Sequence, residues 1–133
     1  MSDNYVIYCS RRPEPPELTD FVASFGRFGT EPLDEEIGCQ CWSIDFLEGS
    51  INFEYFVEGF DDYMEESDIK ETEEALGEMW LSSVSIHMFG FRGEDTQRAY
   101  RKTEEIAVAF AKRWKSVVYG PSRDVFWQPE VQR

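Results

Sequence analysis

The sequence predicts a single α+β domain over residues 1–133, a two-layer sandwich in which two main helices cover a mixed or mostly antiparallel sheet of five to six strands. The length of 133 residues fits one domain. The chain is 41% hydrophobic and 16% aromatic, which is enough to bury a core. Short alternating runs, typical of strands, are interspersed with stretches that have helical periodicity.

The first predicted elements are a strand and a short helix. Residues 5–9 are a β-rich run, which the prolines at 13, 15 and 16 end. Pro15 and Pro16 suit the first turn of a helix over about 15–26, with an apolar face made by Leu18, Phe21, Val22 and Phe25. Residues 28–40 hold two glycines, a proline and three consecutive acids, and they predict a loop.

Residues 41–47 and 51–57 predict two strands joined by a tight turn at Gly49-Ser50. Each strand alternates, so each has an apolar face for the core, made by Trp42, Ile44 and Phe46 in the first and by Ile51, Phe53, Tyr55 and Val57 in the second. The second face carries Asp45, Asn52, Glu54 and Glu58. That carboxylate-bearing face could be an active site, although a solvated strand surface is the more common arrangement.

The remaining elements complete the order β-α-β-β-α-β-α-β-β. A helix is expected over about 68–76 and a central strand over 80–91. The clearest helix of the chain begins near Asp95 and runs to Lys115, because apolar residues recur there at helical spacing. Two short strands follow at 116–119 and 124–127.

Acidic residues are concentrated between Glu31 and Glu78, where seventeen of the 27 acids occur with a single base, Lys70. The net charge of the whole chain is −14. Such a charge repels nucleic-acid phosphates and anionic lipid, so we expect no direct nucleic-acid binding and no membrane partner. It favours a basic protein partner. The alternative explanation is that the charge serves solubility only.

The part of this segment that we expect to meet a partner is its second half, from Glu58 to Glu78. Ten acids against one base would destabilise the free fold by self-repulsion, which a basic partner would offset. The aromatic residues in and beside it are of types enriched at interface centres. The predicted partner-binding residues are Glu54, Glu58, Phe60, Asp61, Asp62, Tyr63, Glu65, Glu66, Asp68, Glu71 and Glu74. The alternative is a solvated loop whose aromatic side chains pack into the core.

The sequence shows no catalytic motif, and we expect no enzymatic activity, no cofactor and no metal site. Cys39 and Cys41 are the one close pair of soft ligands, and His87 is the only histidine. With Cys9 they would make a four-ligand zinc set, but the usual spacing of two residues between cysteines is missing. No nucleophile-elbow pattern surrounds a serine or cysteine that His87 could activate.

The C-terminal half has an order of features that resembles a known class of protein. These features are Leu76-Gly77, a strand around Val84-Ser85-Ile86, an alanine-rich helix ending in Ala-Lys-Arg-Trp, and residues 117–121. Over about residues 68–127 this order resembles small acidic bacterial proteins that include immunity proteins of polymorphic and contact-dependent toxin systems. The resemblance implies a stoichiometric inhibitor that occupies the active site or basic groove of a toxin, such as a nuclease.

Two alternatives stay open beside the immunity hypothesis. The first is a nucleic-acid mimic that blocks a DNA- or RNA-binding protein, and the second is a small enzyme or metal protein that uses His87 with Cys39 and Cys41. For location, the N-terminus has no signal-peptide pattern, no apolar run is long enough for a membrane span, and three cysteines do not suit a secreted disulfide framework. We therefore expect a cytoplasmic protein.

Overall fold

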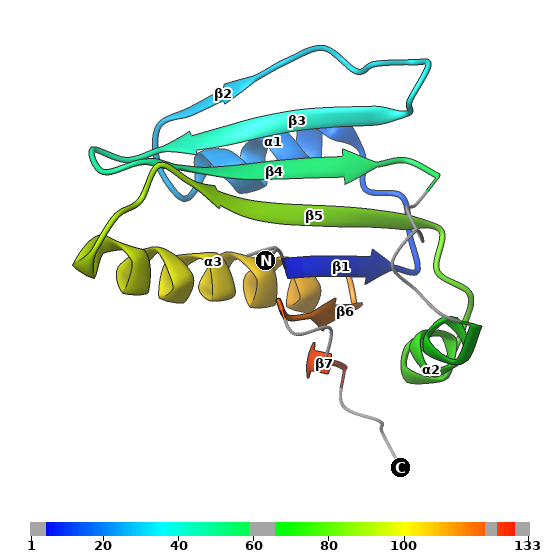
Figure 1. The fold of residues 1–133 in the computed structure, drawn as a ribbon. Helices are drawn as coiled ribbons and strands as arrows, with labels where there is room; N and C mark the ends of the chain where they lie inside the picture. Colours follow the sequence, from blue (N-terminus) through cyan, green and yellow to red (C-terminus); the bar gives the residue numbers. More distant parts are fainter. Residues whose placement is uncertain (1–4, 59–65, 122–124, 130–133) are drawn as a thin grey trace.

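The structure is a computed structural model that describes residues 5–58, 66–121 and 125–129. Within these residues the chain forms three helices and seven strands (Figure 1). In chain order the elements are β1 (Tyr5–Cys9), α1 (Pro15–Ala23), β2 (Phe28–Thr30), β3 (Cys39–Asp45), β4 (Ser50–Phe56), α2 (Glu66–Leu76), β5 (Ser82–Phe89), α3 (Glu94–Arg113), β6 (Ser116–Tyr119) and β7 (Val125–Trp127).

All seven strands belong to one antiparallel sheet with the order β2-β3-β4-β5-β1-β6-β7. Helices α1 and α3 lie on the same side of this sheet, α1 behind β3 and β4, and α3 along β5, β1 and β6 (Figure 1). The predicted α+β class is therefore confirmed. The sheet has more strands than the five to six expected.

The extra strand is β2, which lies inside the segment predicted as a loop. It has three residues with Gly29 at its centre, and it pairs with β3 through Phe28–Ile44 and Thr30–Trp42. A glycine-centred segment of this length has weak strand propensity of its own. The edge of β3 supplies the hydrogen-bonding partner that makes it a strand, and this long-range contact is not visible in the local sequence.

The core lies between the sheet and helices α1 and α3. The alternation predicted for β3 and β4 is confirmed, since the strand residues that face the helices are buried: Trp42, Ile44, Ile51, Phe53 and Tyr55. Residues of β1 and β5 on the same side, such as Ile7 and Ile86, are also fully buried. Helix α1 ends at Ala23, three residues earlier than expected.

Aromatic rings join the two layers. The centroid of the Phe110 ring in α3 lies 5.7 Å from the ring centroid of Phe21 in α1 and 5.6 Å from that of Phe53 in β4. It lies 4.6 Å from the ring centroid of Trp114. Phe21 in turn lies 5.4 Å from Trp114. Contacts of this kind contribute about 0.5–1.5 kcal/mol each beyond the area that they bury. These four residues, which we call the aromatic layer, connect both helices to the sheet.

Helix α2 packs against a separate cluster at the β1–β6 end of the sheet. Leu76 is 1% exposed and joins Tyr8, Val117 and Tyr119 in this cluster. The Thr72 hydroxyl lies 2.6 Å from the Tyr119 hydroxyl, which ties the helix to β6. Trp80, which the sequence placed in the central strand, lies in the connection before β5, and its ring is 5.2 Å from that of Tyr8.

Replacing Phe110 with Ala should reduce the free energy of unfolding by about 3–5 kcal/mol, because the ring is fully buried between two helices and the sheet. Chemical denaturation followed by circular dichroism measures this change. Phe89→Ala is the matched control: the side chain is 70% exposed, so its loss should change the same quantity by less than about 0.5 kcal/mol. Equal losses from the two variants would contradict the position of the core.

Candidate functional site

Strands β3, β4 and β5 bring a set of polar side chains together on the side of the sheet away from α1 and α3. The strand register places Cys41 beside Glu54 and Glu54 beside Ser85, and it pairs Asn52 with His87. All of these positions alternate with core residues, so a strand's two-residue period fixes their side. We call this group the polar face, made by Cys39, Cys41, Ser43, Asn52, Glu54, Ser85 and His87.

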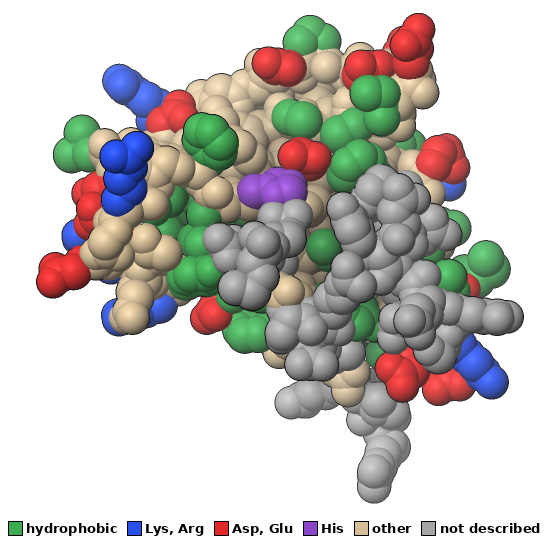
Figure 2. Space-filling model, viewed as in Figure 1, with side chains coloured by type: hydrophobic (Ala, Val, Ile, Leu, Met, Phe, Trp, Pro, Cys, Tyr) green, Lys and Arg blue, Asp and Glu red, His purple; other side chains and the backbone are tan. Residues whose placement is uncertain are grey.

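His87 is the centre of the polar face. Its Nε2 atom lies 3.1 Å from Glu54 Oε1 and 3.0 Å from Ser85 Oγ. Figure 2 shows the chain's only histidine reaching the surface on this side of the molecule. The side chains of His87 and Glu54 are 29% and 34% exposed, so the pair is partly shielded from water.

The contacts of His87 do not reproduce a serine-hydrolase relay. In that mechanism the imidazole accepts the serine proton at one nitrogen while the carboxylate binds the other nitrogen. Here Ser85 and Glu54 both approach the same atom, Nε2. The arrangement suits a structural hydrogen-bond network better than proton transfer from Ser85.

The pKa of Glu54 is lowered from the ordinary value of 4.5, mainly because His87 hydrogen-bonds to the carboxylate. Partial burial of the carboxyl opposes this change, and the electrostatic interaction with His87 adds to it. The folded protein therefore favours the ionised form of Glu54.

The two neighbouring cysteines also lie on the polar face. Cys39 and Cys41 are half-buried, and their Sγ atoms are 3.9 Å apart. Burial raises the pKa of the Cys39 thiol to about 12, with smaller contributions from Cys41, Glu54 and Asp34, and burial also raises the pKa of Cys41. At neutral pH both groups are thiols.

The four-ligand zinc set with Cys9 is wrong. Cys9 is 0% exposed and belongs to the core on the helix side of the sheet, whereas Cys39, Cys41 and His87 are on the other side. Tetrahedral zinc needs its four ligands around one point. Within residues 5–58, 66–121 and 125–129, no three His, Cys, Asp or Glu side chains are grouped to hold a metal ion.

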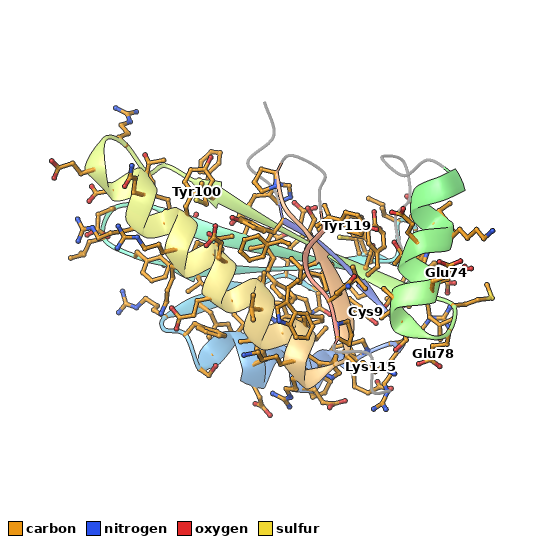
Figure 3. All side chains as sticks on the ribbon, turned by 90° about the horizontal axis from the view of Figure 1, so that it is seen from below. Cys9, Glu74, Glu78, Tyr100, Lys115 and Tyr119 are labelled. Carbon is orange, nitrogen blue, oxygen red and sulfur yellow. The ribbon has the colours of Figure 1, made fainter. Side chains whose placement is uncertain are left out.

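The acidic residues of the described chain are mostly at the surface. Ten of those between Glu31 and Glu78 are exposed: Glu31, Asp34, Glu35, Glu36, Asp45, Glu48, Glu58, Glu71, Glu74 and Glu78. Figure 3 shows Glu74 and Glu78 directed outward from α2 and its C-terminal end. Helix α2 therefore presents carboxylates on the side opposite its contact with the sheet.

The predicted partner-binding residues that the structure describes are distributed among three places. Glu54 is on the polar face, and Glu71 and Glu74 are on α2. Glu58 follows β4, where its carboxylate is 80% exposed and accepts a hydrogen bond from Arg12 at 3.0 Å. Helix α2 also includes Glu66 and Asp68, and Phe60, Asp61, Asp62, Tyr63 and Glu65 lie outside the described residues, so their roles stay predictions.

Sequence reasoning missed two members of the polar face. Ser85 was treated only as part of a strand, yet its hydroxyl contacts His87. Ser43 is on the same side and faces Asn52 across β3 and β4. The two-residue alternation of β5 places Ser85 and His87 on one side, so this signal was present. The pairing of β5 with β4, which brings Glu54 beside Ser85 and His87, is a long-range contact that the local sequence does not show.

A hollow lies between the N-terminal part of α3 and the connection of β3 to β4. It has a volume of about 220 Å³ and is lined by Phe46, Glu48, Ile51, Phe91, Asp95, Arg98, Ala99 and Lys102. The cations at its mouth already have partners, since Arg98 contacts Asp95 and Lys102 lies 3.6 Å from Glu105. Its lining combines apolar side chains with charged side chains, of which Asp95, Arg98 and Lys102 are in ion pairs.

No helix in the described part of the chain is long and apolar enough to cross a membrane. Comparison of the sequence with protein-family models and with curated proteins, and of the fold with solved structures, finds no match.

The variant Glu54→Gln should reduce the free energy of unfolding at pH 6 by about 0.5 kcal/mol, because it removes a partly exposed carboxylate that His87 stabilises. A lowered pKa gives stability that is present above pH 4.5, the ordinary pKa of Glu, and that is lost as the pH falls through the folded-state value. The difference between variant and wild type should therefore shrink below pH 4.5, as urea denaturation at several pH values can measure.

The control for this experiment is Glu48→Gln, which removes one exposed carboxylate at the β3–β4 turn. It corrects for the loss of a single charge from a strongly acidic protein. A destabilisation by Glu54→Gln that increased toward pH 3 would contradict the assigned direction of the pKa change.

Proposed function

We propose that the protein is a non-catalytic acidic binding domain of the immunity type, which acts in the cytoplasm and neutralises a basic toxin effector by covering its active site or groove. The observation that carries this proposal is the surface concentration of carboxylates in the segment from Glu31 to Glu78. Ten of its acids are exposed in the described residues, and the segment contains one base, Lys70.

Charge is distributed unevenly over the surface of the protein. Residues 90–115, which include α3, hold seven bases and four acids, so this part of the helix layer has a small positive charge. The carboxylates of α2 and of the 31–36 segment belong to other parts of the surface. An uneven field of this kind accelerates association with an oppositely charged surface and orients the approach.

Helix α2 supplies a firm platform for part of the charge. Its inner side is anchored by Leu76 and by the contact between Thr72 and Tyr119. Glu71 and Glu74 lie one turn apart and are exposed. A helix that is already anchored loses less conformational entropy when a partner binds than a segment that must first fold, which favours tight binding.

The direct experiment is co-expression with the product of the adjacent reading frame. The proposal expects that product to be basic, to arrest growth when expressed by itself, and to be neutralised by this protein in a one-to-one complex of nanomolar affinity. Failure to restore growth and to bind that product would overturn the proposal. Competition by duplex DNA for the same surface of the partner would favour the nucleic-acid-mimic alternative.

The double variant Glu71→Gln/Glu74→Gln should slow association with the basic partner by about tenfold at low salt, because these charges steer the encounter. The dissociation rate should change less. The matched control is Glu94→Gln/Glu105→Gln, which removes two exposed carboxylates from α3. Stopped-flow association rates at several salt concentrations provide the measurement, and equal effects of the two double variants would contradict a role for α2.

A further inference from the structure

The pair formed by Cys39 and Cys41 has geometry that the proposed binding function does not use. Both residues are in β3, two positions apart, so their side chains are on the same side of the sheet. Their Sγ atoms are 3.9 Å apart, and both residues are half-buried, so a small ion can reach them from solvent.

We propose that Cys39 and Cys41 form a two-thiolate binding site for a soft monovalent cation of the Cu⁺ or Ag⁺ class. Thiolates are the protein ligands that such cations prefer. Metal–thiolate bonds are about 2.3 Å long, so two sulfurs 3.9 Å apart need to separate by about 0.7 Å to hold one ion in line between them. Small rotations of the two side chains on their strand provide that movement.

The number of ligands at the site determines which class of metal ion it can bind. Zinc needs four ligands, and in the part of the chain that the structure describes the cysteine pair belongs to no group of three or more ligands. A soft monovalent cation is satisfied by two thiolates, so this site suits Cu⁺ and Ag⁺ and not Zn²⁺. This departs from the expectation from sequence that the chain has no metal site.

Acidic residues neighbour the two cysteines along the backbone, and their charge favours the arrival of a cation. Glu54 is the strand partner of Cys41. The backbone of Asp34 pairs with that of Cys39 in an isolated antiparallel β-bridge. The backbone N–H of Glu31 donates to the carbonyl of Cys41 at 3.2 Å. A surface of this sign raises the local concentration of cations.

Binding exchanges two protons for one cation. Each thiol gives up its proton to solvent, each sulfur becomes a thiolate bound to the ion, and no electron is transferred. The resulting centre has one negative charge. The site is separate from the carboxylates of α2, so its loss leaves the contribution of α2 to the proposed partner binding intact.

The test uses the full chain with Ag⁺, which does not change oxidation state, and with Cu⁺ in competition with bicinchoninate. Native mass spectrometry should show one ion per wild-type chain. Each of the variants Cys39→Ser and Cys41→Ser should lose affinity by at least about 100-fold, because the remaining sulfur is a single ligand. Ag⁺ should also raise the melting temperature of the wild type and not that of the double Cys→Ser variant.

His87→Ala is the control for a third ligand, and it should leave the affinity for Cu⁺ unchanged. Cys9 stays in every variant and is inaccessible in the core, so it serves as the internal control for non-specific thiol binding. Three results would each overturn the proposal: single Cys→Ser variants that bind as well as wild type, an equal loss in His87→Ala, or Zn²⁺ bound as tightly as Cu⁺. Circular dichroism verifies that each variant is folded.

Discussion

The aromatic layer between the sheet and its two helices is the contact on which the other elements depend. Phe110 and Trp114 of α3 meet Phe21 of α1 over Phe53 of β4, so residues from distant parts of the sequence stabilise one another. Because strand residues alternate, burying one side of the sheet also fixes which side chains are left for the other side.

The polar face follows from that constraint. Once Phe53 and Ile86 point toward the helices, Glu54, Ser85 and His87 must point away from them. A one-residue slip of β4 against β5 would bury Glu54 in the core, at a cost of several kcal/mol for a carboxylate without a partner. The hydrophobic core therefore specifies the polar network, and the contact between His87 and Glu54 makes only a small addition to stability.

The sequence predicted the elements with internal periodicity well. The class, the central strands and the long helix were correct, because the alternation of residues 41–57 and the helical spacing before Trp114 are local signals. The strand β2 was missed because its pairing with β3 is a long-range contact. For the same reason the sequence identified His87, Cys39 and Cys41 as candidates but could not show that Cys9 lies on the other side of the sheet from them. Which side of a sheet a residue occupies depends on strands that are far away in the chain.

The position of α2 shows how the fold tolerates its acidic segment. Glu71 and Glu74 lie about one helical turn apart on α2, a separation of about 5–6 Å that is shorter than the screening length of about 8 Å at physiological salt. These charges repel one another and weaken the helix by itself. Leu76 and the Thr72–Tyr119 contact hold α2 against the sheet, so its stability comes from apolar burial on the inner side. A charge density that an isolated helix would not sustain is therefore maintained at the surface, where an oppositely charged partner would relieve the repulsion and gain binding energy from it.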